Sequence, residues 1–94
     1  MPPASASPDP ARVRALIAST LRDLQPGRRE WPTVRDESRL DRDLGLDSLA
    51  RMELFTRAGQ VFGVEIAEDA LRDIETVGDL QRALLDAPSI AKGS

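Results

Sequence analysis

The sequence predicts an all-α fold: a small bundle of three main helices plus one short helix, with a long loop between the first and second helices. Three observations support this prediction. Apolar residues recur at spacings of three and four in three separate segments, which is typical of helices that bury one face. No segment alternates between apolar and polar residues as a strand would, and 94 residues suffice for one small domain.

The first helix is expected to begin at Pro10, because Asp9 can cap its first turn and proline is favoured at the first helical position. It should end before Pro26 and Gly27, which break a helix. The predicted apolar face consists of Val13, Leu16, Ile17, Leu21 and Leu24.

The two ends of the chain have a different composition. Residues 1–8 are rich in Pro, Ala and Ser, which bury too little apolar surface to offset the entropy of ordering. We expect them to form a disordered tail or linker. Residues 88–94 are expected to form a flexible tail, which leaves residues 9–87 as the folded domain.

A long connection runs from residue 26 to residue 47. Pro26, Gly27 and Pro32 interrupt regular structure in it. Loops of this length are uncommon in a small domain unless they pack on the core or serve a site. The expected anchors of this loop on the core are Trp31, Val34, Leu40 and Leu44.

The second helix is expected to run from Ser48 to Phe62, with Gly63 as its C-terminal stop. It is the most apolar of the predicted helices, and its apolar stripe is wide. The stripe consists of Leu49, Met52, Leu54, Phe55, Ala58, Val61 and Phe62.

The rest of the chain should complete the bundle. Residues 64–66 form a short extended connection, and residues 68–72 form a helix of one or two turns. Thr76 is the expected N-cap of the last helix, and Pro88 closes it. The apolar face of this helix consists of Val77, Leu80, Ala83 and Leu84.

The composition excludes several classes of function. The chain has no His and no Cys, so it cannot by itself supply a Ser-His or Cys-His pair, the usual zinc ligands or a disulfide. Its net charge of −3 has the wrong sign for a nucleic-acid binder. No apolar run approaches a membrane span, and the first ten residues do not read as a signal peptide. We therefore expect a cytoplasmic protein that is not an enzyme. We also expect it to be a monomer.

Ser48 stands where the long loop meets the second helix. Unpaired backbone N–H groups and the helix dipole favour an attached or bound anion at such a position. The alternative interpretation is that Asp47 or Ser48 only caps the helix, since both residue types are preferred N-caps. A capping box would need Glu or Gln three residues later, where Ala50 and Arg51 stand.

A calcium-binding loop is another alternative, because Asp41 and Asp43 imitate the start of an EF-hand loop. The pattern fails at its later positions. The fifth residue is Gly45 instead of an oxygen ligand, the sixth is Leu46 where glycine is needed, and the twelfth is Met52 where glutamate belongs. We therefore reject calcium binding here.

The segment from Arg39 to Leu54, RLDRDLGLDSLARMEL, resembles the phosphopantetheine attachment region of acyl carrier proteins. In that family, Asp-Ser-Leu at the start of the second helix carries the prosthetic group on its serine. The likeness extends over residues 9–86 and includes the order of the helices and of the segments 64–66 and 76–80.

This resemblance implies the chemistry of the site. A phosphopantetheinyl transferase, using coenzyme A and magnesium, would attach 4′-phosphopantetheine to Ser48, and Asp47 would be the acidic neighbour that helps to orient the reaction. The thiol at the end of this arm would carry acyl groups as thioesters. A chain without Cys would therefore receive its reactive sulfur with the cofactor.

The resemblance also implies partners: acyl-loading and acyl-using enzymes such as a ligase, a ketosynthase or an acyltransferase. For Leu49, Met52 and Phe55, burial in the core is the alternative interpretation, and Met52 and Phe55 are also candidates for lining an acyl pocket. The candidate partner contacts are Leu46, Leu49, Arg51, Met52, Glu53 and Phe55.

The second helix departs from the strongly acidic helix of fatty-acid-synthesis carriers. Residues 48–62 contain Arg51 and Arg57 against Glu53, a net charge of +1. The segment is more similar to carriers of modular polyketide synthases, or to those joined to a ligase or acyltransferase, within fatty-acid, polyketide or related lipid biosynthesis. One alternative is a peptidyl or aminoacyl carrier domain of a nonribosomal peptide pathway, although Leu46 stands where such domains usually have a second glycine. A carrier-like interaction module without cofactor is the other alternative.

Overall fold

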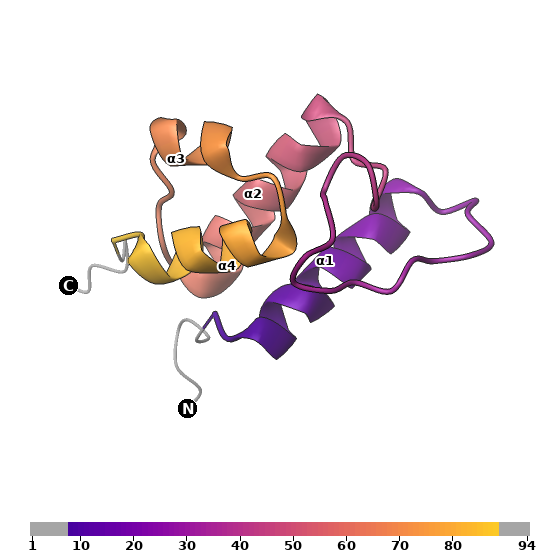
Figure 1. Cartoon of the computed structure of the whole chain (residues 1–94), viewed down its shortest axis with the longest axis horizontal. Helices are drawn as coiled ribbons and strands as arrows, with labels where there is room; N and C mark the ends of the chain where they lie inside the picture. The colour runs from indigo at the N-terminus through magenta and orange to yellow at the C-terminus, as the bar shows by residue number, and fades with distance from the viewer. Residues whose placement is uncertain (1–7, 89–94) are drawn as a thin grey trace.

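Four helices form within residues 8–88, the part of the chain that the computed structural model describes (Figure 1). They are α1 (Pro10–Leu24), α2 (Ser48–Phe62), α3 (Glu68–Asp73) and α4 (Val77–Asp86). This confirms the predicted all-α bundle of three main helices and one short helix, with the long loop between α1 and α2. The predicted tails, residues 1–8 and 88–94, lie outside the described residues except for Pro8 and Pro88.

The helices begin and end where local capping residues place them. The Asp9 carboxylate accepts the Arg12 N–H at 2.9 Å, and Pro10 occupies the first helical position, as expected. Gly63 ends α2 in the left-handed conformation at φ 66°, which glycine adopts without a steric penalty. Such short-range contacts depend only on neighbouring residues, and so they were predictable from the sequence.

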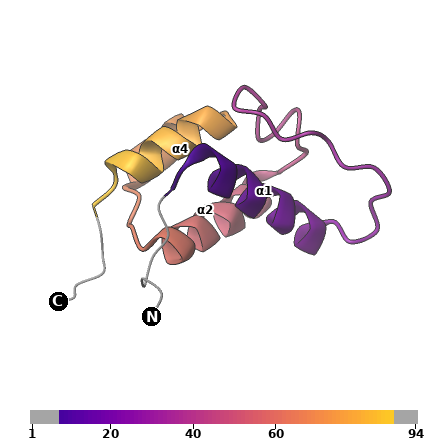
Figure 2. The same cartoon turned by 90° about the horizontal axis from the view of Figure 1, so that it is seen from below.

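The core lies between α1, α2 and α4, which contact one another in all three pairs (Figure 2). It includes Leu40 and Leu44 from the long loop, both fully buried, while Trp31 and Val34 pack against it from the edge. This confirms that the loop lies on the core. The buried hydrophobic residues are Val13, Ile17, Leu21, Leu40, Leu44, Leu46, Leu54, Phe55, Ala58, Phe62, Ile74, Val77, Leu80 and Leu84.

The apolar stripe of α2 is narrower than the sequence predicts. Leu49, Met52 and Val61 are exposed, whereas Leu54, Ala58 and Phe62 are buried at successive turns of one face. The reason is that α1 and α4 cover only one side of α2, and α3, with no buried residue of its own, covers little of the rest. The structure thus leaves apolar side chains of α2 at the surface.

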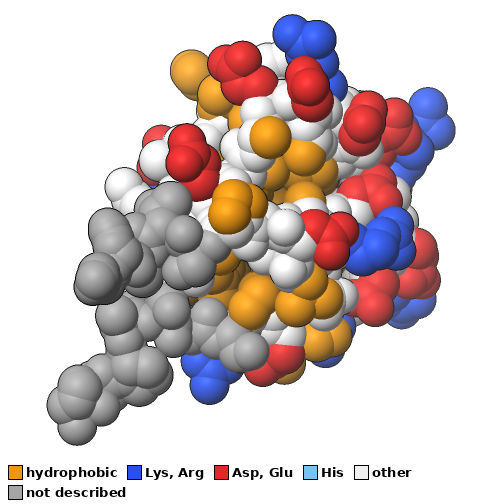
Figure 3. All heavy atoms as spheres, turned by 90° about the vertical axis from the view of Figure 1, so that its left-hand side faces the viewer, with side chains coloured by type: hydrophobic (Ala, Val, Ile, Leu, Met, Phe, Trp, Pro, Cys, Tyr) orange, Lys and Arg blue, Asp and Glu red, His pale blue; other side chains and the backbone are white. Residues whose placement is uncertain are grey.

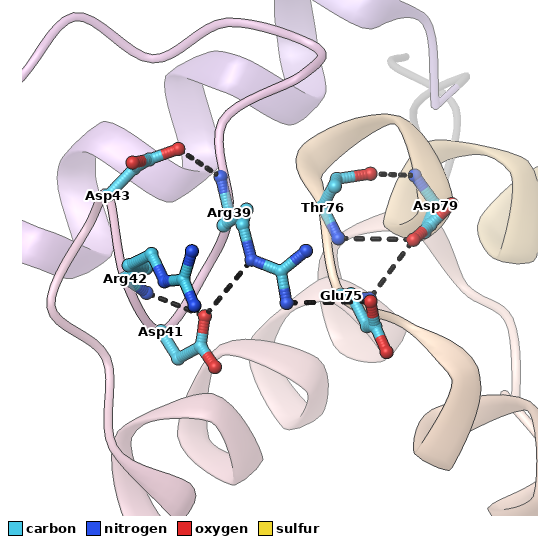
Figure 4. A network of polar contacts seen from close by, with 7 residues as sticks. All are labelled: Arg39, Asp41, Arg42, Asp43, Glu75, Thr76 and Asp79. Atoms are coloured by element: carbon cyan, nitrogen blue, oxygen red, sulfur yellow. Dashed lines mark hydrogen bonds and ion pairs between the residues drawn. The ribbon is translucent and has the colours of Figure 1, made fainter.

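The last part of the long loop is tied to the start of α4. The Leu40 N–H donates to the Glu75 carbonyl at 2.9 Å, and the Val77 N–H donates to the Ser38 carbonyl at 3.0 Å. The Arg39 guanidinium lies between the carboxylates of Asp41 and Glu75, at 3.8 and 3.5 Å (Figure 4). These contacts fix the segment that precedes Ser48.

A capping box starts α4. The Thr76 hydroxyl accepts the Asp79 N–H at 3.1 Å, and the Asp79 carboxylate accepts the N–H groups of Thr76 and Glu75, each at 3.1 Å (Figure 4). Partial burial raises the pKa of Asp79, but these hydrogen bonds outweigh it and hold the pKa below its ordinary value. Thr76 is the predicted N-cap, and its partner Asp79 was not predicted.

Asp79→Asn is expected to make the stability of the fold depend less on pH in the acidic range. A carboxyl group whose pKa is lower in the folded chain stabilises the fold above its unfolded pKa, and this contribution is lost as the pH falls through the folded pKa. The variant should lose about 1 kcal/mol at pH 7 and then decline less than wild type below about pH 4. Thermal unfolding from pH 7 to pH 3 measures both effects. Asp73→Asn, at an exposed position, is the control; an unchanged acid decline in Asp79→Asn would contradict the prediction.

Candidate functional site

Ser48 is the first residue of α2 and is exposed. Asp47, directly before it, is the N-cap, and its carboxylate accepts the Ala50 N–H at 2.8 Å. The capping interpretation is therefore correct for Asp47. The Ser48 hydroxyl is not needed to cap the helix. The result is a serine hydroxyl at the positive end of a helix dipole, open to solvent.

The turn before Ser48 is held from two sides. Gly45 has φ 72°, and the Leu46 N–H donates to the Leu40 carbonyl at 2.9 Å. The side chain of Gln25, the C-cap of α1, donates to the Gly45 carbonyl at 3.2 Å, and Arg28 from the loop beyond it donates to the Leu44 carbonyl at 3.4 Å. The start of α2 is therefore positioned by α1 and by the buried part of the loop together.

Gly45→Ala is expected to destabilise the fold by about 1–2 kcal/mol, because an L-residue pays this cost in the left-handed region. Space is not the reason, since an added Cβ would have its nearest neighbour 3.8 Å away, at the Gln25 amide. Gly27→Ala is the matched control: its added Cβ meets nothing within 4 Å, and its φ is not positive. Chemical denaturation compares the two variants, and equal effects would contradict a conformational role for Gly45.

The two aspartates of the rejected calcium-loop pattern, Asp41 and Asp43, are engaged by neighbouring groups of the loop. The Asp43 carboxylate accepts the Arg39 N–H at 2.8 Å, and the Asp41 carboxylate accepts the Arg42 N–H at 2.6 Å and faces the Arg39 guanidinium (Figure 4). Both carboxylates thus serve the local structure of the loop. Among the described residues, no group of three or more metal-ligating side chains occurs.

The two leucines that flank the serine differ completely in exposure. Leu46 is 2% exposed, so its predicted role as a surface contact for partner enzymes is wrong. Leu49 is 80% exposed, so the alternative of core burial is wrong for this residue. Leu49 lies five residues before the buried Leu54, which places it about 140° away around the helix. Leu46 lies before the helix, where the loop turns into the core.

Met52 and Phe55 also differ in exposure. Met52 is 53% exposed, which excludes the core interpretation for it, whereas Phe55 is only 7% exposed and packs in the core. Both line a recess of about 330 Å³ next to Ser48, and also an adjoining one of about 440 Å³ that continues between α2 and the segment 64–71. Phe55 therefore offers little surface to a partner protein, while Met52 offers much.

On the side of the molecule where α3 lies, hydrophobic side chains gather in the middle of the face, and charged side chains of both signs lie around them (Figure 3). A further recess of about 510 Å³ on the other flank of Met52 is lined mainly by α2. Its lining residues are Leu24, Asp47, Leu49, Ala50, Met52, Glu53 and Thr56. Apolar and partly open surface thus lies on both sides of the start of α2.

The positive charge of α2 is less available than its sequence suggests. The Arg57 guanidinium donates to Asp23 of α1 at 2.7 Å and to Glu53 at 2.9 Å. Hydrogen bonds to Glu53 and Asp23 raise the pKa of Arg57 further above its ordinary value. Glu53 is a neighbour four residues away on the same helix, but Asp23 is 34 residues away in sequence, so only the tertiary structure reveals this second partner.

The structure also brings a residue to the site that the sequence did not indicate. Arg72, in the last turn of α3, lines the same recess as Ser48 and Arg51. In the sequence it reads only as a favourable cation at the C-terminal end of a short helix. No local pattern in the sequence links it to Ser48, since the link depends on how α3 folds back along α2.

A small helical bundle with an exposed serine at the start of its second helix has the form of a carrier domain. A family model described as "Phosphopantetheine attachment site" matches residues 11–84, and the chain belongs to this family. The group that such domains hold covalently is 4′-phosphopantetheine. Residues 11–84 therefore form a carrier domain of this family, as the sequence predicts, and the family match favours a domain that holds the cofactor over a module without cofactor.

A relative points in the same direction. A probable acyl carrier protein from Caulobacter vibrioides (strain NA1000 / CB15N) is 42% identical to this chain over 53 residues, which are 56% of this chain and 62% of the relative. The chain thus spans less than two thirds of that relative's length. Within residues 8–88, no helix is long and apolar enough to cross a membrane.

Proposed function

We propose that Ser48 is the residue that carries 4′-phosphopantetheine. Ser48 is exposed at the first position of α2, lies within the residues that the family model matches, and is not needed as the cap. The backbone N–H groups and dipole at this helix end favour the negative charge of a phosphodiester. The exposed hydroxyl beside a capping aspartate is the observation that carries the proposal.

The chemistry of attachment assigns distinct roles to the chain and to the transferase. Ser48 Oγ gives up its proton to a base of the transferase, its new bond to phosphorus forms the phosphodiester, and 3′,5′-ADP leaves from coenzyme A. The chain contributes no His and no Cys, and the Asp47 carboxylate is engaged by the Ala50 N–H, so we assign the base to the transferase. Asp47 stays fixed by its hydrogen bond to the Ala50 N–H and presents its acidic group beside the hydroxyl.

Residues 9–87 form the carrier domain of this proposal, a monomer of the cytoplasm that delivers acyl groups in fatty-acid, polyketide or related lipid biosynthesis. When bound, the arm supplies a terminal thiol for thioester formation. The name of the Caulobacter relative supports acyl groups over aminoacyl groups. Transfer to the holo-protein from acyl donors, but not from aminoacyl donors, is the expected result; the reverse would favour a peptidyl carrier.

The surface beside Ser48 supports docking through apolar contacts. Leu49 and Met52 are exposed there, while the charge of Arg57 is paired with Asp23 and Glu53. A ligase, ketosynthase or acyltransferase that uses this carrier would therefore present an apolar docking patch. This differs from the basic patch that an acidic second helix would require.

The proposal is tested by incubation with coenzyme A, magnesium and a broad-specificity phosphopantetheinyl transferase, followed by intact-mass measurement. The expected result is a gain of one phosphopantetheine group. Trypsin releases residues 43–51, DLGLDSLAR, in which Ser48 is the only hydroxyl residue, so the modified peptide identifies the site directly. No mass gain, or a gain on another peptide, would contradict the proposal.

A further inference from the structure

The recess of about 330 Å³ beside Ser48 has an unusual charged lining. Among the residues that the structure describes, its charged side chains are two arginines, Arg51 from the first turn of α2 and Arg72 from the last turn of α3. Within residues 8–88, no carboxylate lines it to balance them. The remaining lining residues besides Ser48 are Met52, Phe55 and Leu71. Two helices thus bring two cations to the recess that also contains the serine hydroxyl.

Neither arginine has an anionic partner in the described part of the chain. The ion pairs found within residues 8–88 involve other arginines. The Arg51 Nε atom is buried and has no hydrogen-bond partner there. Arg39 Nε is also without a hydrogen bond, but the Asp41 carboxylate lies 3.8 Å from it. A buried donor without an acceptor costs free energy, which an anion in the recess would recover.

The position of Arg51 is also unfavourable with respect to the helix dipole. It lies in the first turn of α2, where positive charge is unfavourable, and this turn contains no acidic residue. Ser48 and Arg51 are three residues apart, so their side chains are neighbours on one face of the helix. A negative charge attached to Ser48 would compensate both the dipole and the arginine.

We propose that Arg51 and Arg72 together bind the phosphodiester of a 4′-phosphopantetheine group attached to Ser48, and so fix the base of the arm on the α2–α3 side of the bundle. This inference rests on the proposed attachment at Ser48. Guanidinium groups form charge-assisted hydrogen bonds with phosphate oxygens, and their several donors suit an anion approached from two sides. The residues present therefore fit the group that the family carries.

The first test compares the thermal unfolding of the apo-protein and the unacylated holo-protein, each confirmed by intact mass. The unacylated arm is chosen because its phosphodiester is the only charge that it adds. At low ionic strength the holo-protein should melt about 4–8 °C above the apo-protein. This difference should shrink in about 1 M salt, where exposed charges are screened within about 3 Å.

Variants of the two arginines then test whether these residues cause the difference in melting temperature between the apo-protein and the holo-protein. In Arg51→Gln and Arg72→Gln the apo–holo difference should fall to about half or less, and in the double variant it should fall further. Arg29→Gln is the matched control, because Arg29 is exposed in the loop and does not line the recess. It removes the same charge and should leave the difference unchanged.

Arginine Nε–H signals in NMR spectra supply a second readout that does not depend on activity. The Arg51 and Arg72 signals should shift on conversion from apo to holo, while the Arg29 signal stays in place. An undiminished apo–holo difference in the double variant, or unshifted Arg51 and Arg72 signals in a holo-protein of correct mass, would overturn the inference while leaving attachment at Ser48 intact. Failure of the mass gain itself would instead overturn the proposed function and this inference together.

Discussion

Ser48→Ala is expected to abolish the mass gain of one phosphopantetheine group completely, because the substitution removes the only atom that can form the phosphodiester at this position. The fold should be unaffected. Asp47, and not Ser48, provides the cap of α2 through its hydrogen bond to the Ala50 N–H. An exposed surface substitution of this kind changes stability by less than about 0.5 kcal/mol. Intact mass and thermal unfolding of the same sample measure the two expectations together.

Ser19→Ala is the matched control for this experiment. Ser19 is an exposed serine on α1, and its replacement should leave both the mass gain and the unfolding temperature unchanged. Wild-type loading combined with full loading of Ser48→Ala would show that another hydroxyl is used. A large loss of stability in Ser48→Ala would contradict the assignment of the cap to Asp47.

Leu46→Ala is expected to destabilise the fold by about 2–5 kcal/mol, whereas Leu49→Ala should change it by less than about 0.5 kcal/mol. Leu46 is 2% exposed and Leu49 is 80% exposed, so only the first substitution leaves a cavity in the core. A loss of this size is a large share of the stability of a small domain, which is about 5–15 kcal/mol. Urea unfolding of both variants is the measurement.

Leu46→Met provides the second control, because it keeps the volume and apolar character of the side chain and should cost less than about 1.5 kcal/mol. It also keeps the test informative if Leu46→Ala does not fold. Leu49→Ala should in addition weaken transfer to or from partner enzymes, since it removes exposed apolar surface next to Ser48. Equal stability of Leu46→Ala and Leu49→Ala would contradict the burial described here.

The sequence by itself predicted most of the fold. The first residues of α1 and α4 followed from Asp9 and Thr76, whose capping contacts reach only three residues along the chain. The start of α2 was also predicted, with its cap left open between Asp47 and Ser48. The end of α2 followed from Gly63 for the same reason. The loop residues Leu40 and Leu44 were also predicted as anchors, since a long loop in a small domain has few other ways to be stabilised.

The sequence also identified the candidate site, because the motif around Ser48 is contiguous in the chain. It did not identify which neighbours are accessible. The apolar period of α2 predicted one wide stripe, but a helix buries only the part of its surface that other elements cover. Leu49 and Met52 therefore read as core candidates in the sequence and lie at the surface in the structure.

Which charged side chains are paired, and which lie near Ser48, was decided only by the tertiary structure. The sequence gives residues 48–62 a net charge of +1, but Arg57 is paired with Asp23 from another helix. Arg72 reaches the recess of Ser48 although 24 positions separate the two in the sequence. Capping and helical periodicity act between residues that are near in the chain, so a sequence reveals them. Burial, ion pairing and the lining of a recess join residues that are far apart in it, and these are fixed only when the helices pack.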